Sequence, residues 1–143
     1  MAVNKSSVLS MLDLIAEVEQ HKDVLIEMVE SFFENRKTQK RELVPVTKTQ
    51  LSNLLRLASE TTSTKEVLAF IRYQIGRESE KKQDKWRWRK DEFGEQLIRV
   101  LEQEVLRLHN EKKVQIRLMR LFLGYMRRQA IYLGPAVEEG ENK

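Results

Sequence analysis

The chain is poor in the residues from which many catalytic and metal sites are built. It has no cysteine, and its 143 residues include only two histidines, His21 and His109. The absence of cysteine excludes disulfides, thiolate metal sites and a cysteine nucleophile. The histidines lack metal-ligand spacing, and the sequence contains no glycine-rich phosphate loop, HExxH motif or nucleophile elbow. We therefore expect no enzymatic activity, no metal and no cofactor.

Long apolar runs are also absent. No apolar segment approaches the roughly 18 residues of a membrane span, and the first residues are not followed by a signal-type apolar core. We therefore expect an intracellular, cytoplasmic protein without a membrane partner. No segment shows sustained period-two alternation, which predicts an all-α fold.

Apolar residues recur at helical spacing in five segments. The predicted helices span approximately residues 7–36, 48–59, 64–83, 93–108 and 111–132. The first is either one long helix or two nearly continuous ones. Thr47 with Gln50 forms a capping-box pattern before the second helix, and Ser63 with Glu66 repeats it before the third. Gly134 is placed to end the last helix.

These segments predict a compact bundle of about five helices, with a long N-terminal helix and a basic C-terminal helix. We expect residues 1–135 to form a single helical domain. Residues 136–143 are acidic and contain a glycine, which favours a disordered tail.

Positive charge is concentrated in one part of the chain. The net charge is only +4, yet residues 65–130 contain 17 basic and 10 acidic residues, whereas residues 1–64 contain 8 and 9. An uneven distribution of this kind indicates a localised anion-binding face.

The last predicted helix carries a row of cations on one face. Lys113, Arg117, Arg120, Gly124 and Arg127 follow steps of four, three, four and three residues, which align on a helix. A glycine inside a helix costs about 1 kcal/mol relative to alanine, but it lets a phosphate backbone or another helix approach closely. The alternative is an ordinary solvated face with a packing glycine.

Two other segments combine cations with glycine or aromatic residues. Arg72 and Gly76 lie one turn apart, which suits phosphate contact, although Gly76 would equally allow two helices to cross closely. Residues 85–90 interleave Trp86 and Trp88 with cations, a pattern that can stack on unpaired bases. We nevertheless favour at least one of these tryptophans as a core residue.

The last helix also has two apolar flanks. One runs through Val114, Leu118, Leu121 and Tyr125, and a second through Ile116, Met119, Leu123 and Met126. Such a helix is either central in the bundle or uses one flank against another subunit. We interpret the second flank as a subunit contact.

Three segments resemble a known family. Residues 46–58 (VTKTQLSNLLRLA), 70–77 (FIRYQIGR) and 122–128 (FLGYMRR) are similar, in order and approximate spacing, to the Csm-type small subunit of type III CRISPR effector complexes. The resemblance covers roughly residues 43–133. The family often has an arginine where this chain has Ser52, so we expect Arg56, one turn later, to take over that contact.

The resemblance implies a small, non-catalytic, all-α subunit of a prokaryotic RNA-guided defence complex. Several copies would stack beside the guide-bearing backbone subunits, with a basic face along the guide RNA and the target RNA. Target cleavage would belong to the backbone subunits, and signalling or DNA cleavage to the large subunit. We expect non-specific phosphate contacts from Arg72, Arg77, Arg117, Arg120, Arg127 and Arg128, and secondarily from Lys48, Arg56 and Lys113.

Other functions remain open at this point. The related Cmr-type small subunit is a close rival within the same class of complex. A free-standing DNA-binding regulator would need a helix-turn-helix unit, which the turn between the second and third helices imitates without the usual glycine. A nuclease would require metal-dependent cleavage.

Overall fold

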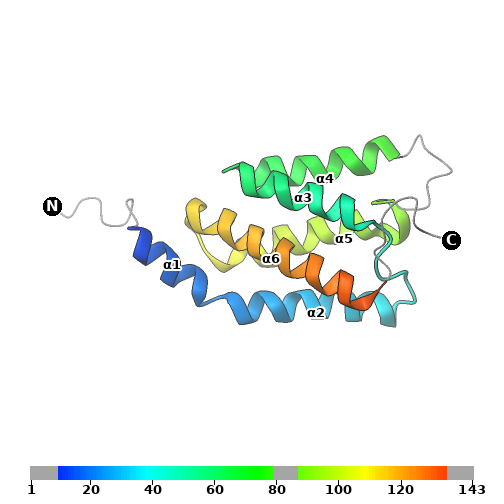
Figure 1. Cartoon of the computed structure of the whole chain (residues 1–143), viewed down its shortest axis with the longest axis horizontal. Helices are drawn as coiled ribbons and strands as arrows, with labels where there is room; N and C mark the ends of the chain where they lie inside the picture. The colour runs from blue at the N-terminus through cyan, green and yellow to red at the C-terminus, as the bar shows by residue number, and fades with distance from the viewer. Residues whose placement is uncertain (1–9, 79–86, 135–143) are drawn as a thin grey trace.

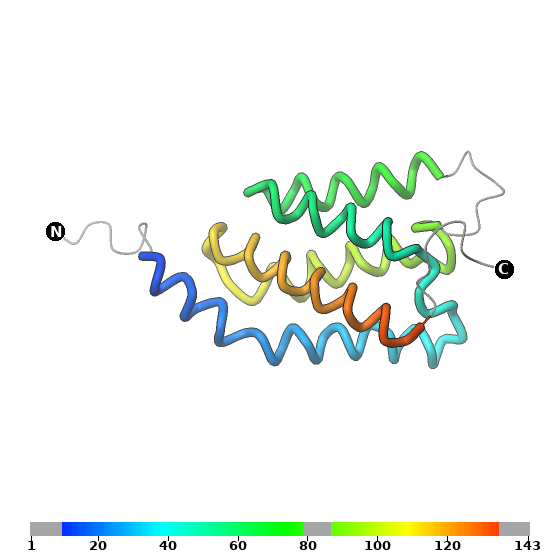
Figure 2. The backbone as a smooth tube through the Cα atoms, viewed as in Figure 1, coloured from blue at the N-terminus to red at the C-terminus, as the bar shows by residue number. Residues whose placement is uncertain are grey.

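The computed structural model describes residues 10–78 and 87–134, and within these ranges it contains helices and no strand. The α-helices are α1 (Met11–Glu19), α2 (Lys22–Thr38), α3 (Lys48–Glu60), α4 (Thr64–Glu78), α5 (Phe93–Val100) and α6 (Lys112–Leu133). A π-helical turn and a 3-10 turn extend α5 to Leu108. The prediction of an all-α fold is confirmed. The N-terminal segment forms two helices, α1 and α2, which change direction at their junction (Figure 2).

Helix α6 runs through the middle of the bundle (Figure 1). It packs against α1, α2 and α3, and against the helical turns that follow α5. Helix α4 packs against α3 and α5 at the side of the bundle away from α2 (Figure 1). None of the helices in the described ranges combines the length and the apolar character needed to cross a bilayer.

The interpretation of the second apolar flank of α6 as a subunit contact was wrong. Ile116, Met119, Leu123 and Met126 are all less than 5% exposed within the single chain. The reason is the central position of α6, because neighbouring helices cover it on both flanks. This flank therefore belongs to the core and offers no surface to another subunit.

The predicted helix ends are confirmed where the structure describes them. The Thr47 Oγ1 accepts a hydrogen bond from the Gln50 amide at 3.1 Å, and the Gln50 side chain accepts one from the Thr47 amide at 2.8 Å. The Ser63 Oγ accepts a hydrogen bond from the Glu66 amide, and this bond caps the first turn of α4. Gly134 ends α6 with a φ of 97°, a conformation that glycine adopts without strain.

The tryptophan expected in the core is Trp88, which is only 1% exposed. It packs against Phe93, so its ring is not free to stack on a base. Trp86 lies outside the described residues, as do residues 79–83 of the predicted third helix and the tail 136–143.

A buried arginine joins the two connectors of the bundle. Arg36, at the end of α2, is completely buried, and its guanidinium donates to the carbonyl oxygens of Glu42, Leu43 and Asp91 and to the Gln96 side chain. Burial lowers the pKa of Arg36 to about 10, although the carboxylate of Asp91 opposes this shift. The side chain therefore remains charged at neutral pH, and its charge is satisfied by oxygen atoms.

The end of α4 and the start of the next described segment are joined by direct hydrogen bonds. The Arg89 amide donates to the buried carboxylate of Glu78 at 3.0 Å, and the Arg89 Nε donates to the Ile75 carbonyl at 3.2 Å. The Arg87 amide donates to the Pro45 carbonyl at 2.8 Å. The chain is thus tied to the bundle on both sides of residues 79–86.

Candidate nucleic-acid interface

Two arginines of the α6 row reach across the seam between α6 and α3. The Arg120 guanidinium donates through Nε to the Ala58 carbonyl and through Nη2 to the Thr61 carbonyl, both at 2.8 Å. The Arg127 Nε donates to the Ser52 Oγ at 2.7 Å. The last carbonyls of a helix have no partner within the helix, so Arg120 satisfies the C-terminal end of α3.

These bonds leave part of each guanidinium available. An arginine has five N–H donors in a planar fork, of which Arg120 uses two and Arg127 one. Burial, and secondarily the neighbouring Arg117, lower the pKa of Arg120 below its ordinary value. The two side chains are therefore charged groups held in fixed positions, with donors left for an external anion.

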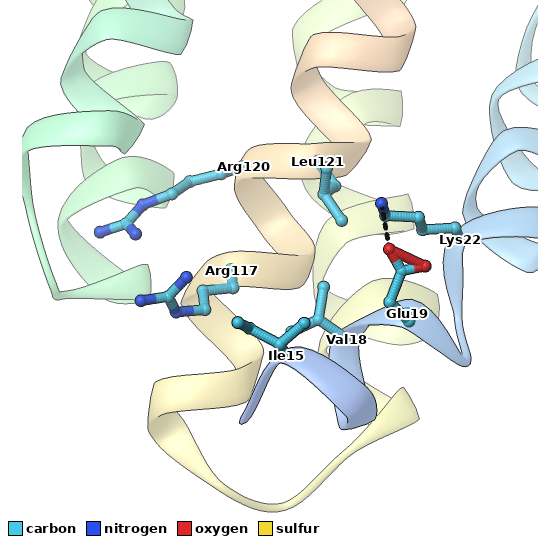
Figure 3. Close-up of a pocket in the computed structure, with 7 residues that line it drawn as sticks. All are labelled: Ile15, Val18, Glu19, Lys22, Arg117, Arg120 and Leu121. Atoms are coloured by element: carbon cyan, nitrogen blue, oxygen red, sulfur yellow. Dashed lines mark hydrogen bonds and ion pairs between the residues drawn. The ribbon is translucent and has the colours of Figure 1, made fainter. Parts of the chain in front are cut away.

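Arg117 has a different environment from its neighbour Arg120. It is half-buried and makes no hydrogen bond or ion pair with the described part of the chain. Its guanidinium extends to the same side of α6 as that of Arg120, beside Ile15 (Figure 3). Both arginines line a depression of about 260 Å³. The acidic side chain in this depression, Glu19, is already neutralised by Lys22 at 2.6 Å.

Space lies above the glycine of the row. A Cβ atom added at Gly124 would meet nothing within 4 Å, and the same holds for Gly76 in α4. Gly94 differs, because its Cβ would lie 2.7 Å from the Ile75 side chain. Packing within the described chain therefore explains Gly94 but neither of the other two. In particular, Gly76 does not serve a close helix crossing within residues 10–78 and 87–134.

The cations of α4 do not join the α6 row. Arg72 pairs with Glu102 at 2.9 Å and lines a separate depression with Gly76 and Arg99. The Arg77 guanidinium lies 6.0 Å from the centre of the Tyr73 ring. The structure therefore places Arg72 in an α4/α5 groove, apart from the α3/α6 seam that Arg120 and Arg127 span.

Three further predicted residues belong to α3 and α6. Lys48 is half-buried at the start of α3, and Lys113 is exposed at the start of α6. Arg128 is exposed on α6, with its guanidinium 5.7 Å from the centre of the Tyr125 ring.

Arg56 and Ser52 have different partners in the structure. It donates to the Asn53 side chain and lines a depression shared with Phe70 and Gln74 of α4. Ser52 instead faces α6, where Arg127 reaches it. The arginine that contacts position 52 therefore comes from the neighbouring helix α6.

Sequence reasoning missed that Arg120 and Arg127 have structural partners. Those partners are main-chain carbonyls and a serine about 60 to 75 residues away, which no local pattern reveals. Sequence reasoning also missed the role of His109, whose Nε2 lies 3.1 Å from a Glu17 carboxylate oxygen. This contact joins α1 to the end of the α5 extension and accounts for the histidine structurally.

No group of three or more histidine, aspartate or glutamate side chains that could hold a metal ion occurs within residues 10–78 and 87–134. Comparison with protein-family models, curated proteins and solved structures found no match to this chain.

Proposed function

We propose that this chain is the small, non-catalytic subunit of a type III CRISPR RNA-guided effector complex. It would bind the phosphate backbone of guide and target RNA through the α3/α6 seam and would assemble with further effector subunits, including copies of itself. Such a complex would place the protein in the prokaryotic cytoplasm. The Cmr-type form of the subunit is the alternative within this class.

The observation that carries the proposal is the arrangement around Gly124. Arg120 and Arg127 are held on either side of it by α3, and no atom of the described residues lies within 4 Å of a Cβ added at Gly124. A glycine inside a helix lowers stability relative to alanine, and packing contacts do not require it here. An external partner that approaches the helix closely would explain why a glycine stands at this position. Guanidinium groups on both sides favour an anionic partner, and phosphate accepts their paired donors.

The rival DNA-binding regulator receives less support. A helix-turn-helix unit crosses two helices at a steep angle and presents the second in the major groove. In this protein α3 and α4 form an antiparallel hairpin, joined at one end by residues 61–63 and diverging toward the other (Figure 1). This geometry favours a surface that binds the phosphate backbone of a nucleic acid over a single recognition helix that enters a DNA groove.

The decisive experiment neutralises two cations, Lys113 and Arg117, that have no hydrogen-bond or ion-pair partner among the residues that the structure describes. Lys113→Gln with Arg117→Gln should weaken binding to an unstructured RNA and flatten its salt dependence between about 50 and 200 mM. Each lost phosphate contact should reduce the slope of log K against log salt by about 0.7 for a single strand. Fluorescence anisotropy of the full chain measures both quantities.

A matched control removes two exposed charges elsewhere, through Lys37→Gln with Arg107→Gln. This variant has the same net charge as the test variant and should keep the wild-type slope. Equal slopes in the test variant and the wild type would show that the α3/α6 seam does not bind phosphate. Co-purification from the native host with guide RNA and neighbouring effector subunits would separate the Csm-type from the Cmr-type assignment.

A further inference from the structure

A second depression lies on α6, one step around the helix from the row of cations. It opens at the seam between α6 and α2 and has a volume of about 350 Å³, within the range of small-ligand pockets. Helix α6 contributes Tyr125, Arg128, Gln129 and Tyr132, and α2 contributes Ile26, Val29 and Glu30.

The two tyrosines give this depression aromatic walls. Tyr125, Gln129 and Tyr132 follow steps of four and three, so they share one stripe of α6. Tyr132 is 81% exposed, although burial of so large a ring is favourable. On the α2 side Ile26 remains 37% exposed, while Val29 is buried and closes the floor. The depression thus presents apolar and aromatic surface that the described chain leaves uncovered.

Polar groups at the rim define the chemistry of the occupant. The Arg128 guanidinium lies 5.7 Å from the centre of the Tyr125 ring, so a planar cation borders the aromatic surface. Glu30 supplies a carboxylate acceptor, and Gln129 supplies both a donor and an acceptor. Arg127, which directly precedes Arg128 in α6, belongs to the proposed phosphate-binding seam. A ligand bound here would therefore combine a flat aromatic ring, hydrogen-bonding edges and an adjacent negative charge.

We propose that this depression binds an unpaired RNA base whose phosphate lies against Arg127 and Arg128. Unpaired bases are recognised by stacking on tyrosine rings and guanidinium planes, together with hydrogen bonds to their edges. Glu30 accepts from an exocyclic amino group, which favours bases such as cytosine. The inference rests on the proposed RNA-binding function and adds a base contact to a surface otherwise assigned to phosphates alone.

The test compares RNA with and without bases. The probes are an oligocytidine RNA of about 12 nucleotides, within the range of single-strand site sizes, and an abasic ribose-phosphate oligomer of equal length. Tyr132→Ala should weaken oligocytidine binding about tenfold, the effect of losing one base-stacking contact. It should leave abasic binding and the salt slope unchanged, because the phosphate contacts remain. Tyr132→Phe keeps the ring and should retain wild-type affinity.

The control is Tyr73→Ala, which removes another exposed tyrosine that also lies beside an arginine, Arg77. It should leave oligocytidine binding unchanged. Wild-type affinity in Tyr132→Ala, or equal losses on both probes, would overturn the base-binding inference while the proposed function stands. Impaired subunit assembly with unchanged RNA affinity would assign the depression to a protein contact and would also overturn it. Absence of salt-dependent RNA binding in the wild type would overturn the proposed function and this inference together.

Discussion

Arg120 has a structural role that can be measured apart from any ligand. Its two hydrogen bonds to the Ala58 and Thr61 carbonyls are charge-assisted and satisfy the C-terminal end of α3. A bond to a charged group contributes about 1.5 kcal/mol or more, and water replaces part of that contribution at a half-buried site. We therefore expect Arg120→Ala to lower the free energy of unfolding by about 2 kcal/mol, which corresponds to a fall in Tm of about 6 to 8 °C.

Arg120→Lys provides a graded comparison. Lysine keeps a positive charge near the helix C-terminus, which remains favourable, but its point charge lacks the planar fork that spans both carbonyls. About half of the alanine effect should return. Thermal and urea unfolding, followed by the negative circular dichroism band of α-helices near 222 nm, measures both variants.

Arg117→Ala is the matched control, because Arg117 precedes Arg120 by one turn and has no hydrogen-bonding partner in the described chain. Its free energy of unfolding should stay within about 0.5 kcal/mol of wild type, as for other surface substitutions. Equal destabilisation by Arg117→Ala and Arg120→Ala would refute the assignment of Arg120 to the end of α3. The result also decides how RNA-binding variants are chosen, since Arg120 substitutions would change stability and charge together.

Three further substitutions test the packing of the bundle. Arg36→Ala should lower the free energy of unfolding by about 4 kcal/mol or more, because buried carbonyls lose their donor; a loss below about 1 kcal/mol in urea unfolding would contradict this. Gly124→Ala should stabilise the isolated protein by about 1 kcal/mol, since its Cβ meets open space. Gly94→Ala should destabilise the protein, because the added Cβ would crowd the Ile75 side chain and the Trp88 carbonyl. A melting experiment should therefore show a higher Tm for Gly124→Ala and a lower Tm for Gly94→Ala.

Local signals predicted the helix boundaries well. The capping box at Thr47 and Gln50 depends on residues three positions apart, and the Gly134 cap depends on one residue, so each is readable from a short stretch of sequence. The all-α class followed from helical periodicity for the same reason. These features depend little on which helices become neighbours.

Features that depend on neighbouring helices were less accessible. Periodicity identified the second apolar flank of α6, but it could not show that the same chain covers Met119 and Met126 completely. Charge spacing identified Arg120 and Arg127, but their acceptors belong to α3. Arg36 was missed altogether, although its position one turn after the buried Phe32 and Phe33 continues an apolar stripe. An arginine in such a stripe is the signal that could have revealed a buried cation.

The hydrogen bonds of Arg89 to Glu78 and Ile75 have a consequence for engineering the chain. They hold the end of α4 against the start of the segment that begins at Arg87, so the number of residues between 78 and 87 does not set the spacing of these two ends. The entropic cost of a longer closed loop grows only slowly, by about 0.6 kcal/mol for each doubling of length. A fluorophore-binding tag or affinity peptide inserted between residues 79 and 86 would thus leave the α3/α6 seam intact, because the bonds of Arg89 to Glu78 and Ile75 remain.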